Sequence, residues 1–221
     1  MLAVVGLAGV IGGPWIYSRY IEGPPDPELH LSSERHAATT GIDGVWTVAA
    51  GRGSERSQVG YRAHQQLWWQ TVTVDGRTDQ VRGRIVIDAN ALQSADFVVD
   101  IASMTSTHHG RDERFRSADV MDAAKHPIAG LAVSEPIDLS GVPADGAPAS
   151  IEVPAQLTLK GVTRQVAVQL DVQRSGNRVL AAGQIGVNFA DYTVNPPAPF
   201  AGLLKVAPDA TVEFLVTLVK Q

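Results

Sequence analysis

Three histidines are the side chains in this sequence whose type and spacing could support metal chemistry. His108 and His109 are adjacent, and His126 lies downstream of them. Adjacent side chains on a strand point to opposite faces, so both imidazoles could ligate one metal ion only from a loop, with His64 or His126 as a third ligand. A metal- or histidine-dependent enzyme therefore remains an alternative, although the spacing alone predicts no metal site.

Arg111 and Asp112 are the second candidates, and they lie in the segment Ser103–Pro127, the one sizeable helix-capable insert in the chain. We expect a short charged helix here, capped by Ser, Thr and Gly residues and ended by Pro127. No nucleophile or base accompanies the pair at a catalytic spacing. We interpret Arg111 and Asp112 as an ion pair and caps that fix the insert over one end of a sheet or barrel. Because the chain also has no Gly-x-Ser-x-Gly elbow, Gly-rich phosphate loop or paired-carboxylate motif, an enzyme is not predicted.

The elements that must position these residues are strands, because apolar and polar residues alternate along most of the chain. Ile151, Val153, Ala155, Leu157 and Leu159 share one face, for example. Asp-Gly at 75–76 predicts a turn. Comparable alternation occurs within 46–48, 59–63, 71–74, 81–87, 97–101, 166–172, 181–189 and 212–218. Eight to ten such strands without long helices are typical of an antiparallel barrel or sandwich.

Small residues on the apolar face favour a barrel over a sandwich. Ala63, Ala155, Ala181 and Gly183 lie where a solid core would use larger side chains. In a barrel of about eight strands, small inward residues leave room for one ligand.

The composition argues against a nucleic-acid partner and excludes cysteine-based sites. The net charge is −5 and no basic run occurs, so nucleic acid is not an expected partner. The chain has no cysteine, which rules out a disulfide framework and any Cys-ligated zinc or iron–sulfur site. No cofactor is indicated.

The N-terminal residues predict a membrane anchor. Leu2–Ile21 carries no charge before Arg19, and a helix of this length would span the roughly 30 Å core of a bilayer. A buried core helix is the alternative. We expect residues 1–21 to form one transmembrane helix, 22–43 an extended Pro-containing linker that holds the domain off the membrane, and 44–220 the barrel. This arrangement predicts a single-pass protein of the cell membrane with an extracytoplasmic barrel, although charge alone does not fix the orientation.

Three segments in this order give the chain a resemblance to the YceI-like proteins, which are lipocalin-like barrels associated with binding polyisoprenoid lipids. The segments are Tyr61–His64 with Gly83–Asp88, then Arg111–Asp112 with Phe115–Ser117, Asp119 and Lys125–Pro127, and finally Leu157–Arg164. The resemblance implies a lipocalin-like, up-and-down antiparallel β-barrel of about eight strands with a short helical insert. Gln65–Gln70 and the prolines at 196, 197 and 199 depart from the family pattern, which affects the loops expected to border the barrel mouth.

The resemblance also implies a ligand, namely an isoprenoid lipid such as a quinone or a polyprenyl carrier. For any single inward residue, plain core packing is favoured over ligand contact, and a solid-cored interaction module or a homodimer remains open. Trp68–Trp69 could form a sugar-stacking platform or an interfacial anchor, or one ring could plug the barrel. The candidate ligand-binding residues are Trp46, Tyr61, Val153, Ala155, Leu157, Val168, Ile185, Phe189 and Phe214.

Overall fold

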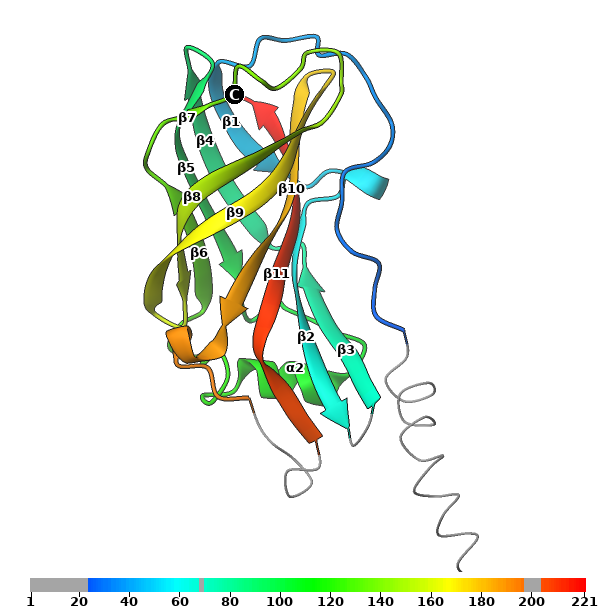
Figure 1. Ribbon diagram of the computed structural model, residues 1–221, viewed down its shortest axis with the longest axis vertical. Helices are drawn as coiled ribbons and strands as arrows, with labels where there is room; N and C mark the ends of the chain where they lie inside the picture. The colour runs from blue at the N-terminus through cyan, green and yellow to red at the C-terminus, as the bar shows by residue number, and fades with distance from the viewer. Residues whose placement is uncertain (1–23, 68–69, 197–203) are drawn as a thin grey trace, which may run out of the picture.

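The computed structural model describes residues 24–67, 70–196 and 204–221, and strands dominate it (Figure 1). The predicted anchor, Leu2–Ile21, lies outside the described residues, as do Trp68 and Trp69. Within these described ranges, no helix has the length and apolar character needed to cross a bilayer.

The described part of the chain forms an 11-stranded sheet, one α-helix and two short 3-10 helices. The helix is α2 (His109–Arg116), and the 3-10 helices are η2 (Gly53–Glu55) and η3 (Phe189–Tyr192). The strands are β1 (Gly44–Ala49), β2 (Gln58–Leu67), β3 (Gln70–Thr78), β4 (Val81–Asp88), β5 (Ala91–Asp100), β6 (Ile128–Val133), β7 (Ile137–Asp138), β8 (Ala149–Leu159), β9 (Val162–Ser175), β10 (Arg178–Asn188) and β11 (Leu204–Lys220).

Eight of these strands, β1, β4, β5, β6, β8, β9, β10 and β11, close into an antiparallel barrel. The long strand β11 makes the closure, because its C-terminal part pairs with β1, placing Leu218 opposite Val48, while β10 pairs along its other edge. The N-terminal part of β11 pairs instead with β2, so the β2–β3 hairpin extends the wall at one end. The predicted all-β antiparallel barrel with one short helix is confirmed.

The turn predicted at Asp75–Gly76 is wrong. Both residues lie inside β3, where Gly76 is opposite Tyr61, and Asp79 and Gln80 make the connection to β4. A Cβ atom at Gly76 would stand 2.7 Å from Cε1 of Tyr61. Glycine is therefore needed here because the tyrosine ring approaches the backbone closely.

The predicted end of the helical insert is also wrong. Helix α2 ends at Arg116, well before Pro127. Ser117 has an extended backbone, and its hydroxyl donates to the carbonyl of Arg114 over 2.7 Å. A serine that bonds the backbone in this way competes with the next helical turn, so the chain continues as successive turns.

The segment before β1 packs against the barrel. Residues 26–42, here called the strap, run in an extended conformation along the outer wall and join β1 (Figure 1). The backbone amide of Thr39 donates to the carbonyl of Gly176 (2.7 Å), and the side chain of Gln173 donates to the carbonyl of Glu34 (2.9 Å). Leu29 is buried in a small apolar cluster with Ala182 and Leu215. The segment expected to be a linker is thus bonded to the barrel.

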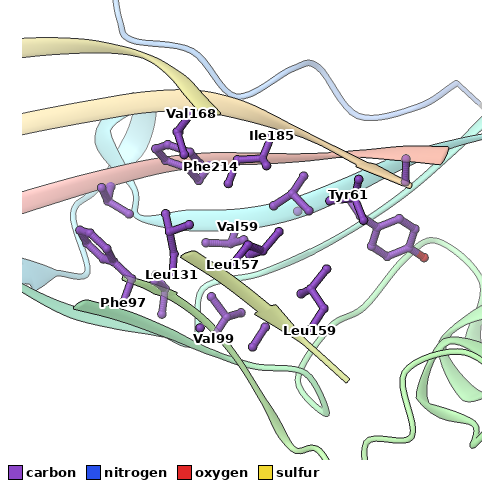
Figure 2. Close-up of a pocket in the computed structure, with 18 of the residues that line it drawn as sticks. Val59, Tyr61, Phe97, Val99, Leu131, Leu157, Leu159, Val168, Ile185 and Phe214 are labelled. Carbon is purple, nitrogen blue, oxygen red and sulfur yellow. The ribbon is translucent and has the colours of Figure 1, made fainter. Parts of the chain in front are cut away.

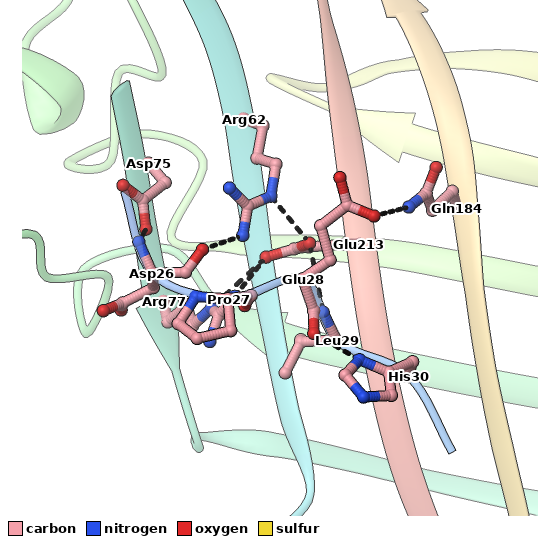
Figure 3. A network of polar contacts seen from close by, with 10 residues as sticks. All are labelled: Asp26, Pro27, Glu28, Leu29, His30, Arg62, Asp75, Arg77, Gln184 and Glu213. Carbon is pink, nitrogen blue, oxygen red and sulfur yellow. Dashed lines mark hydrogen bonds and ion pairs between the residues drawn. The ribbon is translucent and has the colours of Figure 1, made fainter. Parts of the chain in front are cut away.

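The strap covers a charged residue on the outer wall of β11 (Figure 3). Glu213 is fully buried and accepts hydrogen bonds from Nε of Arg62 (2.9 Å) and Nη2 of Arg77 (2.7 Å). The backbone amide of Leu29, which lies on the strap, also donates to the Glu213 carboxylate over 3.3 Å. The two arginines also donate to the strap carbonyls of Asp26 and Pro27. A buried carboxylate is stable only when its charge is paired and its oxygens are bonded. Arg62 and Arg77 pair the charge of Glu213, and the strap adds the hydrogen bond from Leu29.

Candidate functional site

An apolar cavity of about 570 Å³ lies inside the barrel (Figure 2). Its walls come from strands all around the barrel, and the side chains labelled in the figure line it. They are Val59, Tyr61, Phe97, Val99, Leu131, Leu157, Leu159, Val168, Ile185 and Phe214. An interaction module with a solid core predicts no such cavity, so the structure contradicts that alternative.

Most of the residues expected to contact a ligand lie in the cavity wall. They are Tyr61, Val153, Leu157, Val168, Ile185, Phe189 and Phe214. Trp46 and Ala155 are buried but do not line the cavity. The indole Nε1 of Trp46 donates to the carbonyl of Ile42 over 2.7 Å, so this ring belongs to the packing between the strap and β1. Ligand contact itself stays a prediction for all of these residues.

Aromatic rings lie over glycines of the neighbouring strand, which keeps them against the wall. Phe97 is opposite Gly83, and a Cβ atom at Gly83 would stand 2.2 Å from Cδ1 of the ring. Phe214 is opposite Gly183 in the same way, with a distance of 2.7 Å to Cζ. The sequence predicted free space for a ligand at Gly183, but the Phe214 ring fills it. Ala63 and Ala181 do line the cavity.

One end of the cavity is polar and open. The two lining residues that are exposed to solvent, Gly110 and Arg114, are both on α2. Tyr61 lies there too, with its ring stacked on Phe115 of α2 at a centroid distance of 4.8 Å. The charged residues of the lining are Arg111 and Arg114, and no carboxylate lines the cavity in the described part of the chain. The mouth is therefore positively charged.

Burial sets the ionisation of the phenol at this mouth. It raises the pKa of Tyr61 to about 12, against a smaller opposing effect of the nearby Arg111 charge. The hydroxyl therefore stays neutral at physiological pH, and it can donate a hydrogen bond to a polar ligand group.

Helix α2 is held over the mouth by polar contacts with the loop before it. Asp112 is buried, and its Oδ1 accepts hydrogen bonds from the backbone amide (2.8 Å) and the hydroxyl (2.6 Å) of Ser106. Nη1 of Arg116 donates to the carbonyls of Ala102 (3.2 Å) and Met104 (3.1 Å). These contacts fix the orientation of the helix, and with it the positions of Arg111 and Phe115.

The opposite end of the barrel is closed by apolar packing. Ile42, Leu139 and Val179 are buried there and line the cavity floor. The ammonium of Lys220 lies 5.7 Å from the centroid of the Trp46 ring on the outside of this end. The cavity is thus closed at the end next to β1 and open at the end next to α2.

The histidines do not assemble into a metal site. His108 lines the cavity, His109 is exposed, and the ring of His126 packs against Gly161 in the β8–β9 turn. His64 contacts the hydroxyl of Thr73 on the outside of the hairpin. Among the residues that the structure describes, no three His, Asp or Glu side chains lie close enough together to hold a metal ion.

Sequence reasoning missed two residues that shape the site, Arg114 and Lys160. Arg114 of α2 lines the polar mouth together with Gln65, from a segment expected near the mouth, and His108, which the sequence offered only as a candidate metal ligand. Lys160, in the β8–β9 turn, donates to two backbone carbonyls of the segments beside the mouth. Its signal in the sequence was a lysine where a tight turn favours glycine or asparagine.

A closed antiparallel barrel around a blind apolar cavity defines the class of ligand-binding β-barrels. Residues 46–218 match the model of the YceI-like domain, which covers most of the chain. The protein belongs to the YceI-like family.

Curated relatives and solved structures are similar to this chain at low identity. A UPF0312 protein of Vibrio vulnificus is 30% identical over 129 residues, and one of Vibrio campbellii is 26% identical over 129 residues. Both matches cover 55% of this chain and 65% of the relative, so the chain matches less than two thirds of the length of these relatives.

The structural matches show the fold. A polyisoprenoid binding domain from Saccharophagus degradans, implicated in plant cell wall breakdown, superposes with a TM-score of 0.64 at 22% identity, covering 80% of this chain and 98% of that domain. BcnA of Burkholderia cenocepacia gives a TM-score of 0.58 at 20% identity, with coverage of 73% and 95%. The YceI protein of Campylobacter jejuni gives 0.54 at 14% identity, with coverage of 69% and 88%.

Proposed function

We propose that this barrel binds and sequesters an isoprenoid lipid, such as a quinone or a polyprenyl carrier. The observation that carries the proposal is the apolar cavity of about 570 Å³ with a polar mouth beside α2. At roughly 30 Å³ per water-sized group, the cavity accommodates about twenty carbon atoms, or about four isoprene units. The tail of a longer lipid would extend past α2.

Apolar burial supplies the affinity in this proposal. Each buried methylene contributes about 0.8 kcal/mol, so a dozen of them contribute roughly 10 kcal/mol. That contribution is of the same order as the cost of about 4–15 kcal/mol for immobilising a ligand. The polar groups at the mouth, Tyr61 and Arg111 among them, would orient the head group. The mechanism is storage or transfer of an intact lipid, and no bond in the lipid is broken.

Two further observations support the ligand class. The YceI-like family is a family of binding domains, and the Saccharophagus degradans neighbour is described as a polyisoprenoid binding domain. We also propose that Leu2–Ile21 anchors the chain, so that the barrel stands on the outer face of the cell membrane close to its supply of lipid.

Native mass spectrometry of the full chain, followed by organic extraction and identification of the lipid, tests the proposal. We expect an isoprenoid at close to one per chain, and its head group will distinguish a quinone from a polyprenyl carrier. An empty protein that takes up neither added quinone nor added polyprenol would refute the proposal.

A further inference from the structure

The turn between β8 and β9 carries a lysine that joins two other segments. Nζ of Lys160 donates to the carbonyl of Asp119 over 3.0 Å and to the carbonyl of Thr193 over 2.9 Å. Asp119 lies in the turns that follow α2, and Thr193 follows η3 at the end of β10. One ammonium group therefore links three segments that are far apart in the sequence.

The two joined segments form the cavity wall beside the mouth. Their lining residues are Val120, Met121, Phe189, Val194 and Pro196. They also meet directly, because the backbone amide of Asn195 donates to the same Asp119 carbonyl over 2.9 Å. The seam between the two segments is thus held by one backbone hydrogen bond and by both bonds of Lys160.

The backbone conformation of this turn does not by itself favour a lysine at position 160. Lys160 has φ +48° and Gly161 has φ +76°, so both residues of the tight turn are left-handed. Glycine and asparagine adopt this conformation readily, whereas a long side chain is disfavoured. The contacts of the ammonium explain the lysine. Gly161 is fixed by packing, because a Cβ atom there would stand 2.6 Å from Cε1 of His126.

We propose that Lys160 is a positioning residue that holds this seam closed and sets the rate at which a bound lipid enters and leaves. The inference rests on the proposed lipid binding. Lys160 does not line the cavity, so it makes no contact that would favour the bound lipid over the empty barrel. Its loss therefore raises the association and dissociation rates together and leaves the equilibrium affinity nearly unchanged.

Exchange of retinol by the full chain tests this role, because retinol is a fluorescent isoprenoid of a size that suits the cavity. Lys160→Met keeps the apolar stem and the strained Cβ atom but removes both hydrogen bonds. We expect its dissociation rate to rise about tenfold while the dissociation constant changes by less than about twofold. Lys160→Arg should restore most of the wild-type rate.

Lys220→Met is the matched control. Nζ of Lys220 also donates to a backbone carbonyl, that of Gly41 (3.2 Å), but at the closed end of the barrel. We expect this variant to exchange retinol at the wild-type rate. A Lys160→Met rate equal to that of the wild type, or an equal increase in both variants, would overturn the assignment of the seam to Lys160.

Hydrogen exchange in the ligand-free chain separates this inference from the proposed function. The amide of Asn195 donates across the seam to the carbonyl of Asp119 (2.9 Å), and the amide of Val194 donates beside it to the carbonyl of Phe189 (3.0 Å). Both amides should exchange faster in Lys160→Met than in Lys220→Met. Unchanged exchange would refute the role of Lys160 whether or not retinol binds. A wild-type chain that binds neither retinol nor any other isoprenoid would instead refute the proposed function.

Discussion

Replacement of Glu213 by glutamine tests whether the strap and the barrel form one cooperative unit. Glu213 is fully buried under the strap and accepts four hydrogen bonds (Figure 3). One comes from Arg62, two come from Arg77, at 2.7 and 3.2 Å, and one comes from the amide of Leu29. Glutamine has nearly the same shape but keeps only one acceptor oxygen, and its NH₂ group would face donors.

The magnitude follows from these contacts. Glutamine loses about half of them, and breaking a buried charge pair by changing one partner costs about 3–5 kcal/mol. The side chains of Arg62 and Arg77 retain 11% and 15% exposure, so water partly solvates the guanidinium groups once the carboxylate is gone. We therefore expect the lower end of the range, about 3 kcal/mol of unfolding free energy.

Urea unfolding of the full chain, followed by circular dichroism, measures this loss. Glu152→Gln is the matched control, since Glu152 is exposed on β8 and, in the described part of the chain, its side chain accepts a hydrogen bond only from Gln169. Its unfolding free energy should stay within about 0.5 kcal/mol of the wild type.

The amide of Leu29 provides a local readout of the same change. It should exchange with solvent faster in Glu213→Gln because its acceptor is weakened. If Glu213→Gln cost no more than the Glu152→Gln control, or if Leu29 kept its protection, the idea that this network ties the strap to the barrel would be wrong.

Three other changes have definite expected results. Leu29→Ala removes the strap side chain that packs against Ala182 and Leu215, and should lower the unfolding free energy by about 2 kcal/mol; no loss in urea unfolding would show that the strap adds no apolar stability. Burial raises the pKa of Asp75, so its contribution to stability is present below the unfolded pKa and is lost as the pH rises through the folded pKa. Asp75→Asn should therefore raise the Tm more at about pH 7 than at about pH 4, and an equal shift at both would contradict this. Ala181→Phe places a ring in the cavity and should weaken retinol binding at least about tenfold with the fold retained by circular dichroism; unchanged affinity would mean that the ligand does not occupy this part of the barrel.

The barrel was predictable because its strands carry a local signal. Along β8, Val153, Ala155, Leu157 and Leu159 are buried in strict alternation with polar or exposed neighbours, as the sequence indicated. This pattern depends only on the period of a strand, and each strand repeats it. The same alternation identified most of the inward residues that line the cavity.

The strap was not predictable, because its contacts are long-range and its sequence has no period. Prolines and polar residues in the 22–43 segment suggested an extended linker that holds the domain off the membrane. Glu213 alternates correctly as an outward residue of β11, and nothing local shows that another segment covers this outer face. The burial of Glu213 follows from the fold of distant residues.

Misreading the Asp75–Gly76 dipeptide has the same origin. A glycine after an aspartate is the common signal of a tight turn, but a glycine is also required wherever a ring crosses a neighbouring strand. The two cases have the same local sequence. Only the opposing residue, here Tyr61, distinguishes them, and the pairing of β2 with β3 is not visible in the sequence alone.

These glycine–aromatic pairs also explain why this barrel is hollow. Inward side chains can completely fill the space that eight strands enclose. A cavity therefore forms only if the large side chains lie against the wall. Tyr61, Phe97 and Phe214 each lie over the glycine opposite them, which places the rings along the wall and leaves the centre open. The aromatic residues still bury their apolar surface against the wall, so the barrel keeps much of their stabilisation while leaving space for a ligand. The cavity is thus a consequence of where the glycines lie, more than of small side chains on the inner face.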